Sequence, residues 1–329
     1  MALRLTVAEE VWPLASAFTI SRGSKTEARV VTVTLEGEGG VVGRGECVPY
    51  ARYGETVEGV VQALEAARPR IEAGITRSEV PGLLKPMAAR NALDCAFWDL
   101  EAKRAGEPVW RLAGLKEPPG SLVTAYTLSL GEPAAMAEAA SRERHRPLLK
   151  LKLGRPGDRA RLEAVRKAAP DTRLIVDANE GWSESDLPEL LALSSDLGVE
   201  LVEQPLPADA DSALEGVRRR VPIGADESAH DQRSLGQLEG RYDALNVKLD
   251  KTGGLTEALA LAEAAKIKGF RLMVGCMVST SLSMAPAALV AQLADFVDLD
   301  GPLLLARDRE PCIRYDGSLM HPAPAALWG

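Results

Sequence analysis

The sequence predicts an α/β protein built around a (β/α)8 TIM-type barrel. Eight short apolar runs alternate with Ala-, Leu- and Glu-rich helical stretches, and the runs end at regular intervals. Their ends lie 22 to 27 residues apart, at Thr127, Lys152, Asp177, Glu203, Asp226, Lys248, Gly275 and Asp298. One strand, one helix and two short loops take about this length of chain. The crossovers of a doubly wound sheet vary more, so a barrel is expected at about residues 120–305.

The region before the barrel predicts strands joined by polar loops. Two β-rich runs, 28–36 and 41–47, flank a Gly-rich stretch that suits a hairpin turn. Polar loops are expected on either side of this hairpin, at 19–26 and at 49–56.

Two helices are expected next, at about 56–73 and 85–105. In the second, Leu93, Phe97 and Leu100 recur at steps of three and four residues, as on the buried face of an amphipathic helix. Asp94 and Asp99 in this helix are expected to be solvated or capping. After the barrel, the tail reads as a strand and turn that return to pack on the N-terminal region.

Composition describes an ordinary soluble globular protein. Of 329 residues, 46% are hydrophobic and 26% charged, and the net charge of −8 gives no basic surface for nucleic acid or an anionic membrane. The start lacks the regions of a signal peptide, and the apolar stretch 284–297 is short for a membrane span and contains Asp295. The four cysteines form no CxxC pair. A cytoplasmic location and core or loop thiols are expected.

Three of the runs end on a carboxylate: LIVD at Asp177, VELVE at Glu203 and VPIGAD at Asp226. The carboxyl ends of barrel strands meet at one mouth, so these acids are expected to lie together. There they would raise one another's pKa unless a cation lay between them. Oxygen ligands without a nearby His or Cys indicate Mg²⁺, with Mn²⁺ as an alternative. One such acid alone would more simply cap a helix; three in phase favour a metal site.

Lysines end two of the other runs. Lys150 and Lys152 are two residues apart on one strand and so point to the same side, and Lys248 ends a strand across the barrel. An ion-pair network with the three acids would account for them. Alternatively, Lys150 and the cation would lower the pKa of Lys152 and so poise it as a base near neutral pH. Lys152 and Lys248 would then exchange a proton with the α-carbon of a carboxylate held between them, while the cation stabilises the added charge. Lys150 is also expected to bind the substrate.

An ordered set of motifs resembles the muconate-lactonizing subgroup of the enolase superfamily over nearly the whole chain. The motifs are NALDCAFWDL, KLKLG, VDANEGW, VEQPL, GADES, NVKLDKTGG, VGCMVST and DLDGPLL. The resemblance implies an α+β capping domain at 1–117, a modified barrel at 118–305 and a segment at 306–329 that returns to the capping domain. It also implies the established chemistry of the superfamily, with Asp177, Glu203 and Asp226 holding Mg²⁺ and Lys152 and Lys248 as the acid/base pair.

A histidine base, as in the mandelate racemase type of site, is not expected. The three histidines are His145, His230 and His321, and none ends a strand. His230 follows Asp226 in a loop and is expected at the surface.

The last run points to the substrate. Asp298 and Asp300 are two residues apart and would repel at the mouth unless a cation joined them, and a substrate ammonium would satisfy the pair. The alternative is that Asp300, before Gly301 and Pro302, starts a turn. In the resembling family a DxD here marks dipeptide epimerases, which bind the dipeptide ammonium with it. The resemblance therefore implies a dipeptide epimerase, with L-Ala-D/L-Glu from peptidoglycan turnover as the favoured substrate.

The resemblance also assigns the surroundings of the dipeptide. Thr127, Ser129, Cys276 and Met277 are expected to border it. Arg22 is expected to pair with its side-chain carboxylate, with Arg52 or Lys25 as alternatives. Other readings are an o-succinylbenzoate synthase, an N-acylamino acid racemase or a muconate cycloisomerase of the same subgroup, or a barrel without catalytic activity. The sequence does not show which lysine serves the L epimer and which the D epimer. It also leaves open whether the protein forms a homo-oligomer.

Overall fold

A parallel eight-stranded sheet organises the molecule. The computed structural model describes residues 3–329. The strands follow one another in chain order around the sheet. They are β5 (Tyr126–Leu128), β6 (Leu148–Lys152), β7 (Arg173–Asp177), β8 (Val199–Glu203), β9 (Ile223–Ala225), β10 (Ala244–Val247), β11 (Arg271–Gly275) and β12 (Phe296–Asp298). All eight end within one residue of the predicted positions.

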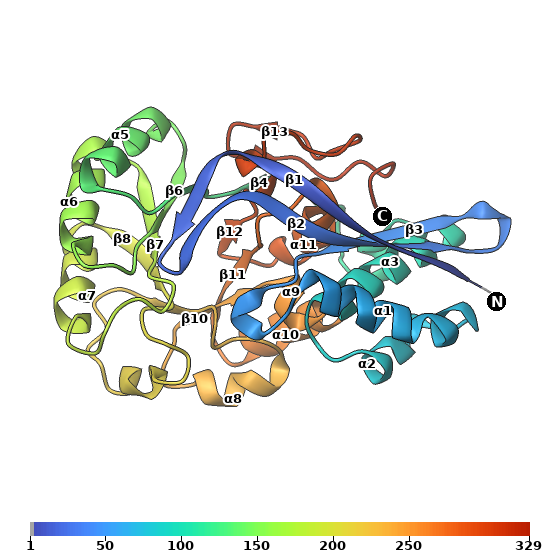
Figure 1. Cartoon of the computed structure of the whole chain (residues 1–329). Helices are drawn as coiled ribbons and strands as arrows, with labels where there is room; N and C mark the ends of the chain where they lie inside the picture. Colours follow the sequence, from blue (N-terminus) through green and yellow to red (C-terminus); the bar gives the residue numbers. More distant parts are fainter. Residues whose placement is uncertain (1–2) are drawn as a thin grey trace.

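The sheet nearly closes into a barrel. At the seam between β12 and β5, the backbone N–H of Ala125 donates to the carbonyl of Val297 over 2.8 Å. Helices cover the outside of the sheet, with α5, α6 and α7 along one edge of the view in Figure 1. They are α5 (Pro133–Glu143), α6 (Asp158–Ala168), α7 (Leu187–Asp196), α8 (Leu235–Leu238), α9 (Leu249–Thr252), α10 (Leu255–Ile267) and α11 (Ser281–Ala291). The predicted TIM-type barrel is confirmed.

An apolar layer fills the barrel below its mouth. It is a buried cluster of one residue from each of seven strands or strand starts, namely Ala125, Leu148, Ile175, Leu201, Ala244, Met273 and Phe296. Side chains two residues further along a strand point to the same side. The residues two positions beyond this layer include Lys150, Asp177, Glu203 and Asp298. The pattern of the strands therefore aims these groups into the barrel above a closed apolar floor.

The N-terminal region forms an antiparallel sheet packed on helices. Its strands are β1 (Arg4–Ile20), β2 (Gly23–Glu36) and β3 (Val42–Cys47), and its helices are α1 (Val57–Glu72), α2 (Val80–Leu83), α3 (Ala88–Ala105) and α4 (Val109–Leu112). Strand β3 lies directly against α3, because a Cβ on Gly45 would come within 2.1 Å of the carbonyl oxygen of Ala92. Figure 1 shows the β1–β2 hairpin reaching from this sheet across to the barrel strands.

One N-terminal expectation was wrong and another was wrong in part. Most of the predicted loop at 19–26 is β structure, because Thr19 pairs with Ser24 and Ile20 with Gly23, which leaves only a tight turn at the hairpin tip. Asp94 and Asp99 are buried instead of solvated, and the capping alternative holds for Asp94, which accepts from the backbone N–H of Thr256 in the first turn of α10. Asp99 accepts hydrogen bonds from Arg44, Lys103 and Gly329. The amphipathic reading of α3 missed them because the helix is buried on nearly all sides.

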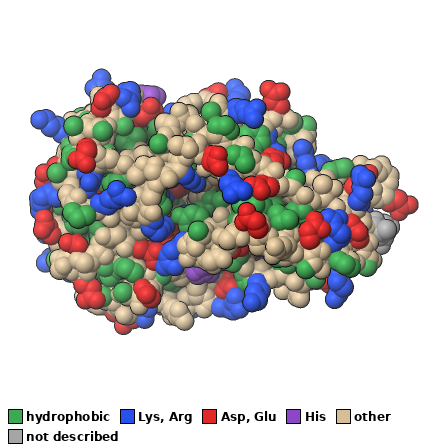
Figure 2. Space-filling model, viewed as in Figure 1, with side chains coloured by type: hydrophobic (Ala, Val, Ile, Leu, Met, Phe, Trp, Pro, Cys, Tyr) green, Lys and Arg blue, Asp and Glu red, His purple; other side chains and the backbone are tan. Residues whose placement is uncertain are grey.

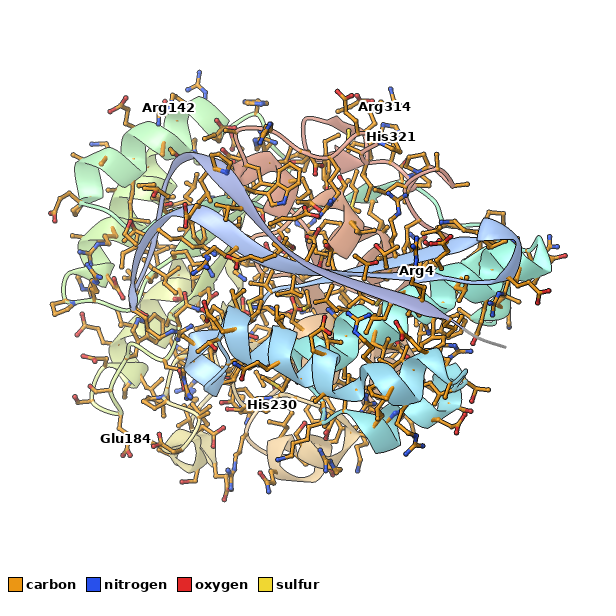
Figure 3. The ribbon with its side chains drawn as sticks, turned by 45° about the vertical axis from the view of Figure 1, so that its right-hand side comes forward. Arg4, Arg142, Glu184, His230, Arg314 and His321 are labelled. Atoms are coloured by element: carbon orange, nitrogen blue, oxygen red, sulfur yellow. The ribbon has the colours of Figure 1, made fainter. Side chains whose placement is uncertain are left out.

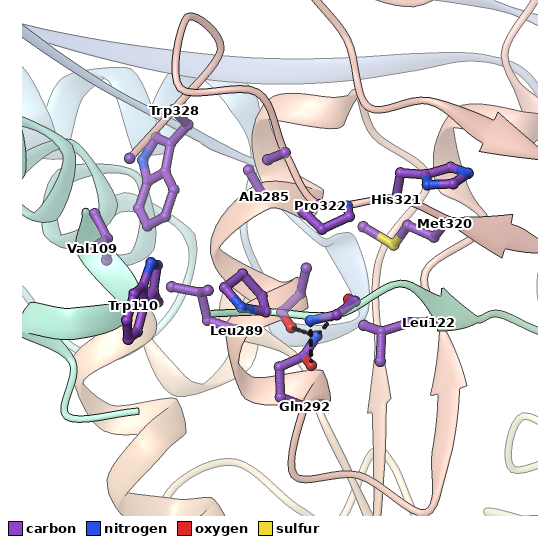
Figure 4. A pocket seen from close by; sticks show the side chains of 15 residues that line it. Val109, Trp110, Leu122, Ala285, Leu289, Gln292, Met320, His321, Pro322 and Trp328 are labelled. Atoms are coloured by element: carbon purple, nitrogen blue, oxygen red, sulfur yellow. Dashed lines mark hydrogen bonds between the residues drawn. The ribbon is translucent and has the colours of Figure 1, made fainter. Parts of the chain in front are cut away.

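The C-terminal segment touches both parts of the chain. Strand β14 (Leu319–Met320) pairs with β13 (Tyr315–Asp316) and with β4 (Leu122–Val123) before the barrel. Further on, the Trp328 indole donates to the carbonyl of Cys95 in α3. Figure 4 shows the pocket of about 60 Å³ that Trp328, Val109 and Leu289 line, with Gln292 hydrogen-bonded to the backbone. None of the predicted site residues lines it.

The boundaries at 117/118 and 305/306 stay a proposal. The division of the strands supports it, because β1–β3 form one sheet and β5–β12 another.

The surface agrees with the composition. Figure 2 shows acidic and basic side chains interspersed over one face. Within residues 3–329, no helix is both long and apolar enough to cross a membrane. The cysteines are free thiols, of which Cys47 and Cys95 are buried.

Candidate active site

Three carboxylates meet at the mouth of the barrel. Asp177 and Glu203 are the last residues of β7 and β8, side by side in register, and Asp226 directly follows β9. All three are buried, and one oxygen from each lies within 4.8 Å of the others. This donor set has the hard oxygen ligands that Mg²⁺ prefers. The cluster is the one that the strand-end pattern predicts.

Lys152 and Lys248 reach this cluster from opposite sides. In the strand order of the barrel, three strands separate β6 from β10 in either direction. The Nζ of Lys152 lies 2.6 Å from Asp177, and that of Lys248, the residue after β10, lies 2.7 Å from Asp226. The two ammonium groups therefore flank the acids from opposing walls.

Lys150 lies between the acids and the last strand. Its Nζ is 2.6 Å from Glu203, 2.7 Å from Asp298 and 3.3 Å from Asp177. Burial works against the charge of Lys150, but Asp298 and Glu203 outweigh it and raise its pKa well above the usual value. Lys150 is thus a fixed positive charge shared by the two acidic groups of the site.

The acids titrate unequally because their neighbours differ. Burial and the nearby charge of Asp177 raise the pKa of Glu203 to about 7. Burial also opposes the charge of Asp177, but Lys152 and Lys150 outweigh it and lower its pKa to about 2. Lys248 and Lys251 lower the pKa of Asp226 in the same way. The lysines therefore hold Asp177 and Asp226 ionised. Glu203 is repelled by the neighbouring carboxylate charge, and a bound cation would relieve this repulsion.

Asp298 and Asp300 lie next to one another on the rim. Asp300 Oδ2 accepts from the backbone N–H of Thr127 over 2.6 Å. Burial and the charge of Asp298 raise the pKa of Asp300 to about 7. Within the described residues, Asp298 Oδ1 is buried and has no hydrogen-bond partner. The pair has one lysine for two carboxylates and leaves a buried acceptor free.

A cavity of about 930 Å³ lies over these groups. Lys150, Lys152, Lys248, Asp298 and Asp300 line it from the barrel. The β1–β2 hairpin and the predicted loop at 49–56 line it from the N-terminal region. Its size is at the upper end of small-molecule sites, so a ligand would be enclosed between the barrel mouth and the N-terminal region.

Two family models match the chain. That of the enolase C-terminal domain-like family covers residues 133–310, and that of the mandelate racemase / muconate lactonizing enzyme N-terminal domain covers residues 2–114. The chain belongs to this family. The resemblance that the motifs indicated is confirmed, and with it the capping role expected of the N-terminal sheet and helices.

Several relatives with known names match almost end to end. The L-Ala-D/L-Glu epimerase of Escherichia coli strain K12 is 48% identical over 317 residues, which is 96% of this chain and 98% of that protein. An N-acetyl-D-glutamate racemase of a Pseudoalteromonas species is 45% identical over 87% of this chain and 91% of its own.

Two solved structures are also similar to this chain over almost its whole length. An enolase family member from Agrobacterium tumefaciens with homology to dipeptide epimerases, with sodium and L-Ala-L-Glu bound, is 52% identical, with a TM-score of 0.97 over 99% of this chain and 100% of that one. The dipeptide epimerase of Enterococcus faecalis V583, solved with Mg and L-Leu-L-Tyr, is 29% identical, with a TM-score of 0.91 over 100% and 99% of the chains.

In this member of the family, the two candidate arginines are held by acids of the barrel. Arg22, at the hairpin tip, lies 2.8 Å from Glu227 and 3.3 Å from Glu180. Arg52 makes a two-pronged contact with Glu180, with both distances 2.6 Å. These ion pairs fasten the capping segments to the loops after β7 and β9.

Lys25 differs from the arginines. It lines the cavity, and in the described part of the chain no carboxylate lies within ion-pair distance of its Nζ. Burial lowers its pKa to about 8, and the nearby charge of Lys152 adds to this. Lys25 is the one of the three candidates whose charge the protein leaves uncompensated.

The remaining predicted neighbours divide into two groups. Thr127, Cys276 and Met277 line the main cavity, as expected for residues that border a substrate. Ser129 does not: it lines an adjoining cavity of about 300 Å³, where its Oγ accepts from the N–H of Thr19 over 3.4 Å. Strand β5 ends at Leu128, so Ser129 has already turned toward the hairpin.

His230 is partly exposed, so the expectation of a surface residue holds in part. The residue, labelled in Figure 3, is half-buried. Its ring meets that of Tyr53 edge to face, with centroids 5.1 Å apart. The loop at 49–56 covers this position because its tyrosines pack down on the barrel.

Sequence reasoning missed several residues that support the site. Asn246 donates to Glu203 over 2.6 Å, and the side chain of Gln204 accepts from the backbone N–H of Asp226 over 2.8 Å. Asn246 lies on β10, two residues before Lys248, where the backbone is still extended, so period-two reasoning could have found it. Lys251 contacts Asp226 from a helical turn, and no strand pattern reaches it.

Proposed function

We propose that this protein is a Mg²⁺-dependent dipeptide epimerase that inverts the α-carbon of the C-terminal residue, with L-Ala-D/L-Glu as substrate. The observation that carries the proposal is the placement of Lys152 and Lys248 on opposing walls of one cavity, with three carboxylates between them. Inversion at carbon needs one group to remove a proton from one face and another to return it on the other.

The metal-ligating residues fit Mg²⁺. Asp177, Glu203 and Asp226 offer converging carboxylate oxygens, and burial together with the charge of Asp177 raises the pKa of Glu203. When bound there, Mg²⁺ supplies positive charge that stabilises the substrate carboxylate as negative charge builds on it. Asn246 and Gln204 keep two of the ligands in place.

The two lysines then move the proton. The lysine on the side of the α-hydrogen accepts it as a neutral amine and becomes an ammonium. The opposite lysine donates a proton as an ammonium and becomes an amine, so the charge of the site is unchanged. The capping segments help by excluding water from the cavity, as the contacts of Arg52 and Tyr53 with the barrel support.

Asp298 and Asp300 are the proposed site of the dipeptide ammonium. The free acceptor on Asp298 and the neighbouring charge of Asp300 support a cationic partner, and a substrate ammonium would donate to both. Relatives solved with dipeptides agree with this class of substrate.

Lys25 is the proposed partner of the side-chain carboxylate. Arg22 and Arg52 are already paired with Glu227 and Glu180, so an acidic substrate side chain would have to compete for them. Lys25 is not paired in this way, and an anion beside it would restore the stability of its charged form. This supports a glutamate at the C-terminal position.

N-acetylglutamate racemisation is the second candidate, because a relative with that name is 45% identical. The reaction would use the same metal site and lysines. Its substrate has no ammonium, so it gives no use to Asp298 and Asp300, and this favours the dipeptide.

The test is α-proton exchange in D₂O with Mg²⁺, followed by NMR. L-Ala-L-Glu, L-Ala-D-Glu, L-Leu-L-Tyr and both enantiomers of N-acetylglutamate are compared. The proposal expects loss of the α-proton signal of the C-terminal residue in both Ala-Glu epimers, with slower exchange in the others. Exchange of N-acetylglutamate alone would support the second candidate, and no exchange in any of the compounds would contradict both.

A cytoplasmic location, homo-oligomeric assembly and a role in peptidoglycan turnover stay predictions from the sequence.

A further inference from the structure

Lys251 is a buried lysine of the charged cluster that the proposed chemistry does not use. It lies in α9, three residues after Lys248, and is 1% exposed. It is not among the residues that line the main cavity. A lysine so deeply buried is costly unless its charge and its donors are all satisfied, so its partners indicate what it does.

All three contacts of the Lys251 Nζ are made at the ends of two neighbouring strands. It donates to Asp226 Oδ1 over 2.6 Å and to the backbone carbonyl of Asp226 over 2.5 Å. The third contact is to the backbone carbonyl of Asn246, over 3.0 Å. The paired register of β9 and β10 runs only to Ala225 and Leu245. The ammonium therefore links the two strands just beyond their last paired residues, where the functional side chains begin.

Asp226 is consequently held by one lysine on each carboxylate oxygen. Oδ1 accepts from Lys251, and Oδ2 accepts from Lys248 over 2.7 Å. Without Lys251, Oδ1 would lose its lysine and the carboxylate could turn. Lys248 would then move with it, because within residues 3–329 Asp226 Oδ2 is the carboxylate oxygen in ion-pair contact with the Lys248 Nζ. Proton transfer tolerates little displacement of the reacting groups.

We infer that Lys251 is a positioning residue that acts through Asp226 on Lys248, and so serves proton transfer on one face of the substrate only. The inference rests on the proposed function. Lys152 is anchored separately, on Asp177 at the end of β7, and has no contact with Lys251. Loss of Lys251 should therefore slow proton transfer on one face of the substrate more than on the other. A general loss of folding or of metal would slow proton transfer on both faces together.

The experiment measures α-proton exchange of L-Ala-L-Glu and of L-Ala-D-Glu separately, in D₂O at saturating Mg²⁺. Lys251→Met removes the ammonium and keeps the side-chain length. Lys251→Gln keeps N–H donors and serves if the Met variant melts below the assay temperature. Lys248→Arg, measured alongside, identifies the epimer whose proton Lys248 removes. In the Lys251 variants, the exchange rate of that epimer should fall at least tenfold more than that of the other. The Mg²⁺ affinity, measured by calorimetry, should change by less than tenfold.

Lys103→Met is the matched control. Lys103 also donates to a carboxylate and a backbone carbonyl, those of Asp99 and Val42, but in the capping domain. It should lower the melting temperature and leave the ratio of the two exchange rates unchanged.

The outcomes separate the inference from the function on which it rests. Equal losses for both epimers, or wild-type exchange in both, would overturn the role of Lys251 while leaving the epimerase intact. A wild-type protein that exchanges neither epimer would overturn the function as well.

Discussion

At the scale of single residues, the cavity combines compensated and uncompensated charges. Arg22 and Arg52 are neutralised by acids of the barrel, whereas Lys25 is not. Asp298 shares Lys150 with Glu203, and Asp300 has a backbone N–H. The positive charge of Lys25 is left over near the capping hairpin, and it is complementary to an acidic side chain. The negative charge left over at Asp298 and Asp300 is complementary to an ammonium. This residue-level balance supports the proposed substrate, and two predictions follow from it.

Lys25→Met should reduce the preference for an acidic C-terminal residue. Removing a charge partner in a desolvated cavity costs about 1.5–3 kcal/mol, so kcat/KM for L-Ala-L-Glu should fall about 10- to 100-fold. The values for L-Ala-L-Leu should change little. Steady-state kinetics with both dipeptides check this. Arg4→Met is the control, since Arg4 pairs with Glu36 in the same hairpin but does not line the cavity. A parallel drop for both dipeptides would argue that Lys25 supports the loop and does not read the substrate.

The double variant Asp298→Asn, Asp300→Asn should lose activity only toward substrates that carry an ammonium group. A buried ammonium left without its charged partners costs about 2–5 kcal/mol, so kcat/KM for L-Ala-L-Glu should fall at least 30-fold. N-acetyl-L-Glu has no ammonium, and any activity toward it should be retained. The readout is the ratio of kcat/KM for the two compounds. An unchanged ratio would mean that the pair only shapes a turn.

At the scale of elements, the strand ends could be predicted and the loops could not. Apolar runs mark buried strands, and polar residues that end them must face the mouth of the barrel, so Lys152, Asp177, Glu203 and Asp298 were all within reach of sequence reasoning. The polar residues of segment 19–26 predict a loop. The segment forms β structure because its two halves pair with each other at the tip of the hairpin, and local polarity does not encode this pairing.

The same limit explains the residues that act between elements. Asp94 and Asp99 are polar residues on a helix and read as solvated, but partners far along the chain satisfy them. Lys251 is fixed by backbone carbonyls of strands that lie beside its own helical turn. Contacts of this kind depend on tertiary packing, and neither periodicity nor spacing records them.

The contact between α9 and the capping domain predicts a dependence of stability on pH. Asp250 accepts from the backbone N–H of Val48 and from Asn91, and burial raises its pKa to about 7. A carboxyl with a raised folded-state pKa binds its proton more tightly when folded. Its contribution to stability is therefore present below its unfolded pKa of about 4 and is lost as pH rises toward 7.

Asp250→Asn keeps an acceptor oxygen and removes this ionisation. The difference in free energy of unfolding, variant minus wild type, should shift in favour of the variant by a few kcal/mol between pH 5 and pH 8, at about 1.4 kcal/mol per pH unit at most. Urea unfolding at both pH values measures it. Asp295→Asn is the control, because Asp295 accepts from the backbone of Leu272 but is exposed. A difference that stays constant with pH would contradict the assignment.

At the scale of the whole molecule, the closed barrel places functional groups where no local element could. Lys152 and Lys248 lie 96 residues apart in the chain and meet because three strands separate β6 from β10 whichever way the barrel is followed. The capping domain closes the space above them, and the apolar floor closes it below. The proposed inversion of a carbon centre depends on this arrangement more than on any single contact.

The most direct measurement is α-proton exchange in D₂O by two single variants, Lys152→Ala and Lys248→Ala, each with both epimers of Ala-Glu. The account predicts a crossed pattern: each variant loses epimerisation, keeps exchange of one epimer and loses exchange of the other, and the two variants retain opposite epimers. Two variants that retain the same epimer, or a variant that still interconverts the epimers at the wild-type rate, would contradict the opposed pair of lysines.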